Sequence, residues 1–219
     1  MTHVAWDIET CPRPYEELSD VHRERHRKES RRRMSEGREE PSDETRSKAA
    51  SLHPMLGWVC CISAVAGNLN EGHREPYSWV AGSEEEEADM LREFWDDIQT
   101  LARSAGQVQW ISFNGKRFDV PFVSARSARH GIVPTNEGIR STHKYRTEAH
   151  LDLANVWQPT WYSLADLCDH LGVDSPKGEF DGSDVAPAVR DGKLGEVTDY
   201  CERDVVATFQ CAQLLQPVH

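Results

Sequence analysis

The sequence of 219 residues lacks the features that would place it in a membrane or outside the cell. No apolar run approaches the roughly 20 residues that a membrane-spanning helix needs. The N-terminus has no basic stretch followed by an apolar one, because Asp7 and Glu9 interrupt it, so no signal peptide is predicted. The six cysteines include no C-x-x-C pair, which favours reduced, buried thiols over disulfides or a zinc site. We therefore expect a cytoplasmic protein that does not contact a membrane.

A net positive charge is missing as well, since the formal net charge is −12. Broad, non-specific binding of nucleic acid needs a basic surface, so the chain as a whole is not expected to show it. The cations that are present concentrate in residues 15–50, a charged stretch with few large apolar side chains. We interpret this stretch as an insertion after the first strand, with a helix over 15–34 and a mobile loop around 37–47.

The basic residues of this insertion allow two interpretations. In one, they cover a solvated helix face, which is the usual role of a run of charges. In the other, they form a basic arm beside the first strand that contacts the phosphate backbone of a nucleic acid, or a replication or repair protein. The residues are Arg23, Arg25, Arg27, Lys28, Arg31, Arg32 and Arg33, opposed locally only by Glu24 and Glu29.

Outside the insertion, the apolar pattern predicts a single α/β domain over residues 1–219. Strands are expected at 4–10, 57–67, 73–81, 107–113 and near 151–153. Helices are expected from residue 83, with a Ser83–Glu86 capping box, and at 119–130, 163–172 and 196–215; in the third, Ser163 precedes Asp166 by three positions. This order predicts a mixed five-stranded sheet with helices on its faces.

The first strand carries two carboxylates, Asp7 and Glu9. Residues two apart on a strand point to the same side, so both acids share a face and Ile8 lies on the other. Two like charges on one face repel, and a hard divalent cation such as Mg²⁺ or Mn²⁺ would remove that cost. The alternative is that Ile8 faces the core and both acids lie in water at the strand end.

Later segments supply matching groups. Asp119 lies where a strand passes into a helix, a common position for site residues in α/β sheets. Tyr200 and Asp204 are four apart on the last helix and therefore lie one turn apart on one face. We hypothesise that Asp7, Glu9, Asp119 and Asp204 converge on two divalent metals about 4 Å apart, which activate a water and stabilise a leaving phosphodiester oxygen. Tyr200 would orient the attacking water.

Three motifs occur in the same order as in a known family: Asp7-Ile8-Glu9, the N-x-x-x-F-D-x-P-F motif over 114–122, and the Y-x-x-x-D motif over 200–204. The sequence resembles the DEDDy class of 3′–5′ exonucleases, which have a ribonuclease H-like fold. It is most similar to stand-alone relatives of the proofreading domain of family B DNA polymerases. The related DEDDh class would have His before Tyr200, where this chain has Asp199. The insertion at 15–50 matches no core element of that fold.

The resemblance implies that Asp7, Glu9, Asp119 and Asp204 hold the metals and that Tyr200 positions the water. It also implies two Mg²⁺ or Mn²⁺ ions as cofactors and release of nucleoside monophosphates from a 3′ end. The leading hypothesis is thus an exonuclease acting on single-stranded DNA. An RNA or oligoribonucleotide exonuclease and a non-catalytic nucleic-acid-binding accessory subunit are the alternatives.

Further residues are candidates for substrate contacts. Thr10 follows Glu9 and could touch the terminal nucleotide, and Asn114 and Phe118 could line the groove. Phe118 would stack on a base, although a core position is equally compatible with the pattern. Lys177 could meet a phosphate or be a solvated lysine. We expect Asp152 to be a structural cap rather than a metal ligand, and His22 and His26 to be surface residues.

Overall fold

A computed structural model of the protein describes residues 1–34, 39–144, 146–176, 178 and 180–216. Strands and helices alternate along most of the chain, as expected for an α/β domain. The elements are β1 (Thr2–Pro12), η1 (Tyr15–Glu17), α1 (Asp20–Arg32), α2 (Asp43–Ser51), β2 (Gly57–Asn68), β3 (Gly72–His73), β4 (Tyr77–Val80), α3 (Glu87–Ala105), β5 (Val108–Ser112), α4 (Asp119–Arg129), β6 (His150–Asp152), η2 (Leu153–Asn155), α5 (Leu164–Leu171), α6 (Val185–Arg190) and α7 (Leu194–Leu215).

The strands form one mixed sheet in the order β3-β2-β1-β5-β6, with β4 also paired to β2. β1 runs antiparallel to β2 and parallel to β5, which runs parallel to β6. The mixed α/β sheet is confirmed, but it has six strands rather than five. The difference arises at 73–81, expected to be one strand. Residues 74–76 leave the sheet there, and Pro76 has no N–H to donate to a neighbouring strand.

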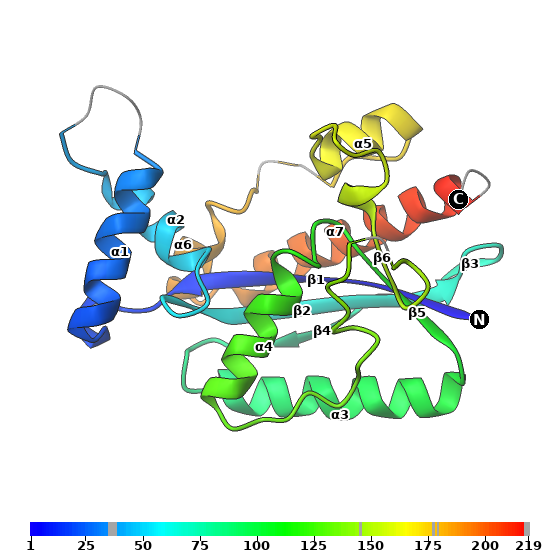
Figure 1. The fold of residues 1–219 in the computed structure, drawn as a ribbon, viewed down its shortest axis with the longest axis horizontal. Helices are drawn as coiled ribbons and strands as arrows, with labels where there is room; N and C mark the ends of the chain where they lie inside the picture. The colour runs from blue at the N-terminus through cyan, green and yellow to red at the C-terminus, as the bar shows by residue number, and fades with distance from the viewer. Residues whose placement is uncertain (35–38, 145, 177, 179, 217–219) are drawn as a thin grey trace.

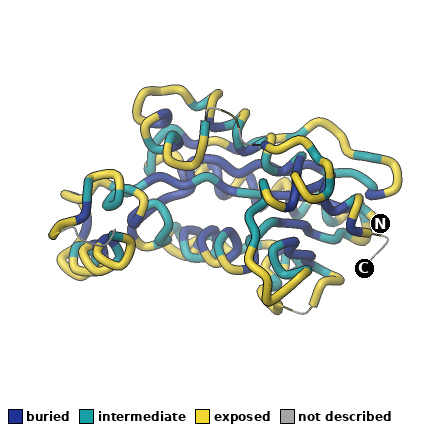
Figure 2. The backbone as a smooth tube through the Cα atoms, turned by 90° about the horizontal axis from the view of Figure 1, so that it is seen from above, coloured by how far each residue is buried: buried dark blue, intermediate teal, exposed yellow. Residues whose placement is uncertain are grey.

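Helices cover both faces of the sheet (Figure 1): α3 and α4 lie on one side, and α5 and α7 on the other. On β1, Trp6 packs against Phe94 of α3 with ring centroids 6.3 Å apart. Ala5 belongs to the core formed with Val205 and Phe209 of α7. Buried residues therefore run along the central strands, while exposed ones concentrate in the outer connections (Figure 2).

The insertion forms α1 and α2, which lie together at one end of the molecule (Figure 1). The predicted helix over 15–34 starts later, because Ser19 caps α1 at Asp20. The predicted loop at 37–47 is wrong over residues 43–47, which belong to the helix Asp43–Ser51, and residues 37 and 38 lie outside the described residues. His26 is buried, with its Nε2 3.0 Å from the carbonyl oxygen of Arg46, so its expected surface position is wrong.

The charges of the insertion largely balance one another. Residues 15–50 contain ten Lys or Arg and ten Asp or Glu. Within α1, Arg27 Nη2 lies 2.6 Å from Glu24 and Arg32 Nη1 lies 3.6 Å from Glu29, one helical turn away in each case. The insertion as a whole is therefore not a net basic arm, and several cations of α1 face acids on the same helix.

Of two capping boxes predicted at helix starts, one forms and the other does not. The Ser163–Asp166 pair forms a reciprocal capping box at the start of α5, and Gly172 ends that helix at φ 71°. The predicted box at Ser83 and Glu86 is wrong, because α3 begins only at Glu87 and Glu86 accepts from Gly82 N instead. None of the helices in the described part of the chain is long and apolar enough to cross a membrane.

Candidate active site

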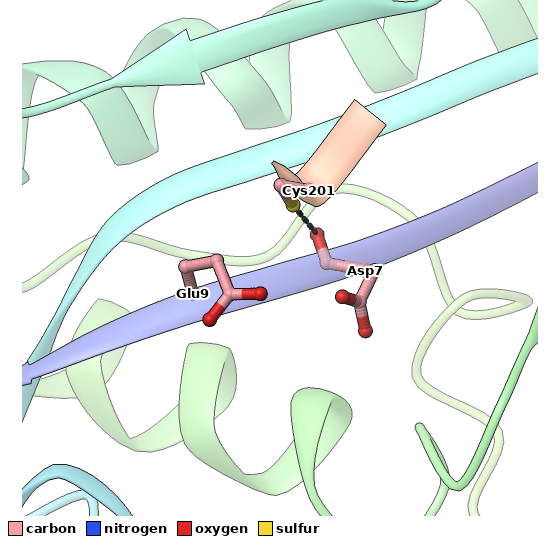
Figure 3. A group of neighbouring side chains, drawn as sticks. All are labelled: Asp7, Glu9 and Cys201. Atoms are coloured by element: carbon pink, nitrogen blue, oxygen red, sulfur yellow. Dashed lines mark hydrogen bonds between the residues drawn. The ribbon is translucent and has the colours of Figure 1, made fainter. Parts of the chain in front are cut away.

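The centre of β1 presents two carboxylates to one side of the sheet. Asp7 and Glu9 are partly exposed, whereas Ile8 between them is buried in the core, as strand alternation requires. Figure 3 shows both side chains with Cys201 of α7 beside them. Carboxylate oxygens of the two acids and the sulfur of Cys201 all lie within 4.8 Å of one another. β1 and α7, far apart in the sequence, thus meet at these residues.

Asp119 reaches the site from the turn that joins β5 to α4. The turn starts at Asn114, whose φ is +64°, and the carboxylate of Asp152 accepts from the N–H groups of Asn114 and Lys116 at 2.7 and 3.2 Å. Only glycine fits at Gly115, since a Cβ there would lie 2.8 Å from Asp119 Oδ2. The turn therefore holds Asp119 in place, and the expected capping role of Asp152 is confirmed.

The carboxyl group of Asp119 is buried and only partly satisfied. Its residue is 2% exposed, and Oδ1 has no hydrogen-bond partner among the described residues. Burial raises the pKa of Asp119 to about 8, despite backbone N–H groups that lower it. A buried polar atom without a partner is uncommon in a folded protein, and a carboxylate oxygen near other acids suits a cation ligand.

Tyr200 and Asp204 come from α7, one turn apart. The thiol of Cys201 donates to the main-chain oxygen of Asp7 at 3.7 Å, and this hydrogen bond joins α7 to the part of β1 that carries the acids. Burial raises the pKa of Tyr200, and the charges of Asp204, Glu9 and Asp7 raise it further. Tyr200 therefore remains a neutral phenol next to the acids.

Asp7 lies within electrostatic reach of the other three acids. Burial raises the pKa of Asp7 most, followed by the charges of Asp119, Glu9 and Asp204. Burial also raises the pKa of Glu9, followed first by the charge of Asp204. These four residues are called the acid cluster below. The charges that act on Asp7 place Glu9, Asp119 and Asp204 near it, and those that act on Tyr200 place the tyrosine near Asp204, Glu9 and Asp7. Among the described residues, the acids with oxygens grouped within 4.8 Å are Asp7 and Glu9.

The donor set of the acid cluster fits a hard divalent cation. Carboxylate oxygens are the ligands that Mg²⁺ and Mn²⁺ prefer, and a dication would offset the mutual repulsion of the acids. Cys201 does not add a soft ligand, because burial raises the pKa of its thiol and the thiol donates to Asp7. Asp7, Glu9, Asp119 and Asp204 are therefore the residues that would hold metal.

The residues predicted to contact substrate lie in different parts of the structure. The Thr10 hydroxyl donates to the main-chain oxygen of Ser51 at 2.8 Å and so joins β1 to α2. Phe118 is half-buried and packs on Phe122 with ring centroids 5.5 Å apart, which is the core position left open by the sequence. Asn114 lines a cleft beside the acid cluster. Lys177 lies outside the described residues.

That cleft was not foreseen from the sequence. It measures about 670 Å³ and lies between the β5–α4 turn, residues 142–144 and residues 154–162. The signal available in the sequence was the pair of aromatic residues Trp161 and Tyr162 within a polar stretch. Trp161 is 79% exposed, which is unusual for tryptophan.

Comparisons with known proteins bear on this geometry. Residues 52–212 match a family model described as a predicted 3′–5′ exonuclease related to the exonuclease domain of PolB. The match begins after the insertion, so Asp7 and Glu9 lie outside it. No curated protein matches the chain.

Among solved structures, the fold resembles the family B DNA polymerase from the hyperthermophilic archaeon Pyrobaculum calidifontis. The TM-score is 0.62 at 16% sequence identity. The alignment covers 99% of this chain but only 24% of the polymerase chain. The likeness therefore identifies the fold alone, a ribonuclease H-like mixed sheet with helices on both faces. The chain spans about a quarter of that polymerase.

Proposed function

Since the chain belongs to the family of predicted 3′–5′ exonucleases related to the exonuclease domain of PolB, we propose that it hydrolyses single-stranded DNA from the 3′ end and releases nucleoside monophosphates. The observation that carries the proposal is the convergence of Asp7, Glu9, Asp119 and Asp204, which come from β1, α4 and α7. The charges of neighbouring acids raise the pKa of Asp7 and Glu9. A bound divalent cation would offset this repulsion.

The acid cluster would hold two divalent ions, Mg²⁺ or Mn²⁺. When bound, such a pair of ions lowers the pKa of a water and stabilises the charge on a leaving phosphodiester oxygen. The carboxylates would hold the two ions in fixed positions, and Asp119 would do so from a well-defined turn. Its position follows from the Gly115 turn and from the hydrogen bonds that Asp152 accepts.

Tyr200 has a separate role in this proposal. Its hydroxyl stays protonated because burial and the neighbouring acids raise its pKa. It can therefore donate a hydrogen bond to one group and accept one from a water, which orients that water toward the scissile phosphorus. Loss of the hydroxyl should lower turnover while leaving the acids and their charge in place.

The test uses oligonucleotides labelled at the 3′ or the 5′ end, incubated with the protein in Mg²⁺ or Mn²⁺. We expect early release of the 3′ label and stepwise shortening of the 5′-labelled strand. The variants are Asp7→Asn and Tyr200→Phe. Asp199→Asn is the matched control, because Asp199 is an exposed acid next to Tyr200 on the same helix. An Asp7→Asn protein as active as the parent would refute the proposal.

The RNA alternative is decided by the same assay with an RNA strand of the same sequence. If the protein hydrolyses the RNA strand faster than the DNA strand, RNA rather than DNA is its substrate. Binding of either strand without metal and without product would instead favour an accessory subunit.

A further inference from the structure

The cleft beside the acid cluster starts at the turn that positions Asp119. Asn114 and Arg117, which line it, belong to that turn. Gly115 between them is in contact with Asp119, since a Cβ at this position would lie 2.8 Å from Asp119 Oδ2. A strand whose 3′ end lies at the acid cluster would therefore have the cleft next to it.

The charge of the cleft is opposite to that of the protein. Its described lining contains Lys116, Arg117 and Lys144 and no Asp or Glu, although the chain carries a net charge of −12. A cationic surface next to clustered acids is not explained by the fold. It suits an anionic ligand that extends away from the acid cluster.

The walls of the cleft are fixed by buried hydrogen bonds. Lys116 is only 5% exposed, and its Nζ donates to the main-chain oxygens of His143 and Arg146, both at 2.7 Å. This lysine therefore holds the 142–144 wall rather than contacting a ligand. On the other wall, the Tyr162 hydroxyl donates to the main-chain oxygen of Leu153 at 2.5 Å. The cleft is thus pre-formed, which reduces the ordering cost of binding.

An exposed aromatic ring and a cation stand together at the cleft. Trp161 is 79% exposed, and the guanidinium of Arg117 lies 5.4 Å from its ring centroid. Arg117 itself is exposed. An aromatic face for a base next to a cation for a phosphate is the combination by which proteins bind single-stranded nucleic acid.

We propose that this cleft binds the nucleotides directly upstream of the 3′-terminal one in single-stranded DNA, with Trp161 stacking on a base and Arg117 contacting the backbone. This assignment rests on the proposed exonuclease function in one respect, which is that the 3′ end of the strand lies at the acid cluster. Stacking without base-edge hydrogen bonds is tolerant of sequence, so the cleft should accept any base.

The first measurement is the affinity for a fluorescently labelled oligothymidylate in Ca²⁺, read by anisotropy. Trp161→Ala should weaken binding by about five- to 150-fold, the effect of one lost base stack. Arg117→Gln should lower the slope of log affinity against log salt by about 0.7, the effect of one lost phosphate contact. The matched controls are Tyr77→Ala, an exposed aromatic on β4, and Arg103→Gln, an exposed arginine on α3, which should bind as the parent does.

The second measurement separates the cleft from the acid cluster. Thymidine 5′-phosphate p-nitrophenyl ester has a scissile bond but no upstream nucleotide. Trp161→Ala should lose rate on the oligothymidylate and keep the parent's rate on the ester, whereas Asp119→Asn should lose both. Equal losses on both substrates for Trp161→Ala would overturn the proposal, as would unchanged oligothymidylate binding.

Failure of the cleft and failure of the proposed function give different results. If Asp119→Asn still hydrolyses while Trp161→Ala binds weakly, the proposed function fails and the cleft stands. If Asp119→Asn is inactive while Trp161→Ala and Arg117→Gln behave as the parent, the cleft proposal fails alone. Competition by polyglutamate as strong as that by DNA, or binding of RNA but not DNA, would overturn the assignment of single-stranded DNA as the ligand.

Discussion

Two groups of buried or half-buried acids in this protein differ in the sign of the charges around them. The first is the acid cluster, whose members raise one another's pKa. The second surrounds Glu87, which is 0% exposed, and is called the ion cluster. There, Arg126 Nε donates to Glu87 at 2.9 Å, His130 Nε2 lies 2.7 Å from it, and the Val59 N–H donates to it at 2.7 Å.

In the ion cluster every acid has a cation as neighbour. Glu84 shows the result: although burial raises its pKa, hydrogen bonds from Arg13 and Arg126 lower it overall. In the acid cluster, neighbouring acids add to the effect of burial. The comparison teaches that burial alone does not mark a functional carboxylate. The distinguishing feature is whether the surrounding residues compensate its charge.

The largest expected effect is on activity. Asp119→Asn should reduce exonuclease turnover by at least about 10³-fold, because catalytic groups that act together lose most of their effect when one of them is removed. Its thermal midpoint should stay the same or rise, since the change removes one member of a mutually repelling set. Product release assays and thermal melts on the same preparation check both. A large fall in the midpoint would show that the acids are structural after all.

In the ion cluster, by contrast, a substitution should reduce stability. Arg126→Met should lower the free energy of unfolding by about 3–5 kcal/mol, because Glu87 is left buried without its main partner. Urea unfolding measures this, with Arg103→Met on exposed α3 surface as the control. The double change Arg126→Met with Glu87→Gln should recover part of the loss. If Arg126→Met is as stable as the parent, Arg126 does not compensate the charge of Glu87, and the difference between the two clusters is refuted.

Divalent metal should distinguish the clusters directly. Mn²⁺ at about 100 times its dissociation constant should stabilise the parent by about 2.7 kcal/mol, because it binds only the folded acid cluster. Asp7→Asn should lose this shift, and Asp199→Asn should retain it. Differential scanning calorimetry with and without metal provides the measurement. An equal shift in Asp7→Asn would place the metal elsewhere.

The effect that is smallest within a single pH unit concerns the buried His150. Burial lowers its pKa to about 3, from an ordinary value of 6.5. Between these values the unfolded chain binds the proton and the folded chain does not, so stability falls as the pH falls from 6.5 toward 3. The contribution is about 1.4 kcal/mol per pH unit. The stability of His150→Gln should fall less steeply over this range, as read by urea unfolding at several pH values.

The motif residues could be found from the sequence because short-range rules place them. Strand alternation puts Asp7 and Glu9 on one face, and helical spacing puts Tyr200 and Asp204 one turn apart. The capping box of Ser163 and Asp166 is equally local, and it forms. These arrangements depend on neighbours within a few positions, so a pattern suffices to predict them.

Long-range contacts account for what was missed. A Ser83–Glu86 capping box was expected to start a helix at residue 83, but α3 begins at Glu87. Glu87 accepts hydrogen bonds from Arg126, thirty-nine positions away. His26 was expected at the surface and is covered by α2. The cleft depends on three separate segments, held by Lys116 and Tyr162. No local pattern encodes such partners.

The sequence by itself determined the type and order of the groups: four carboxylates and a tyrosine on elements whose periodicity sets their direction. The tertiary structure decided which of the many acids lie beside other acids and which meet an arginine. It also brought Trp161 and Arg117 to the same cleft. The physical reason is that charge compensation and stacking act between groups in contact, and contact across the fold follows from packing rather than from spacing along the chain.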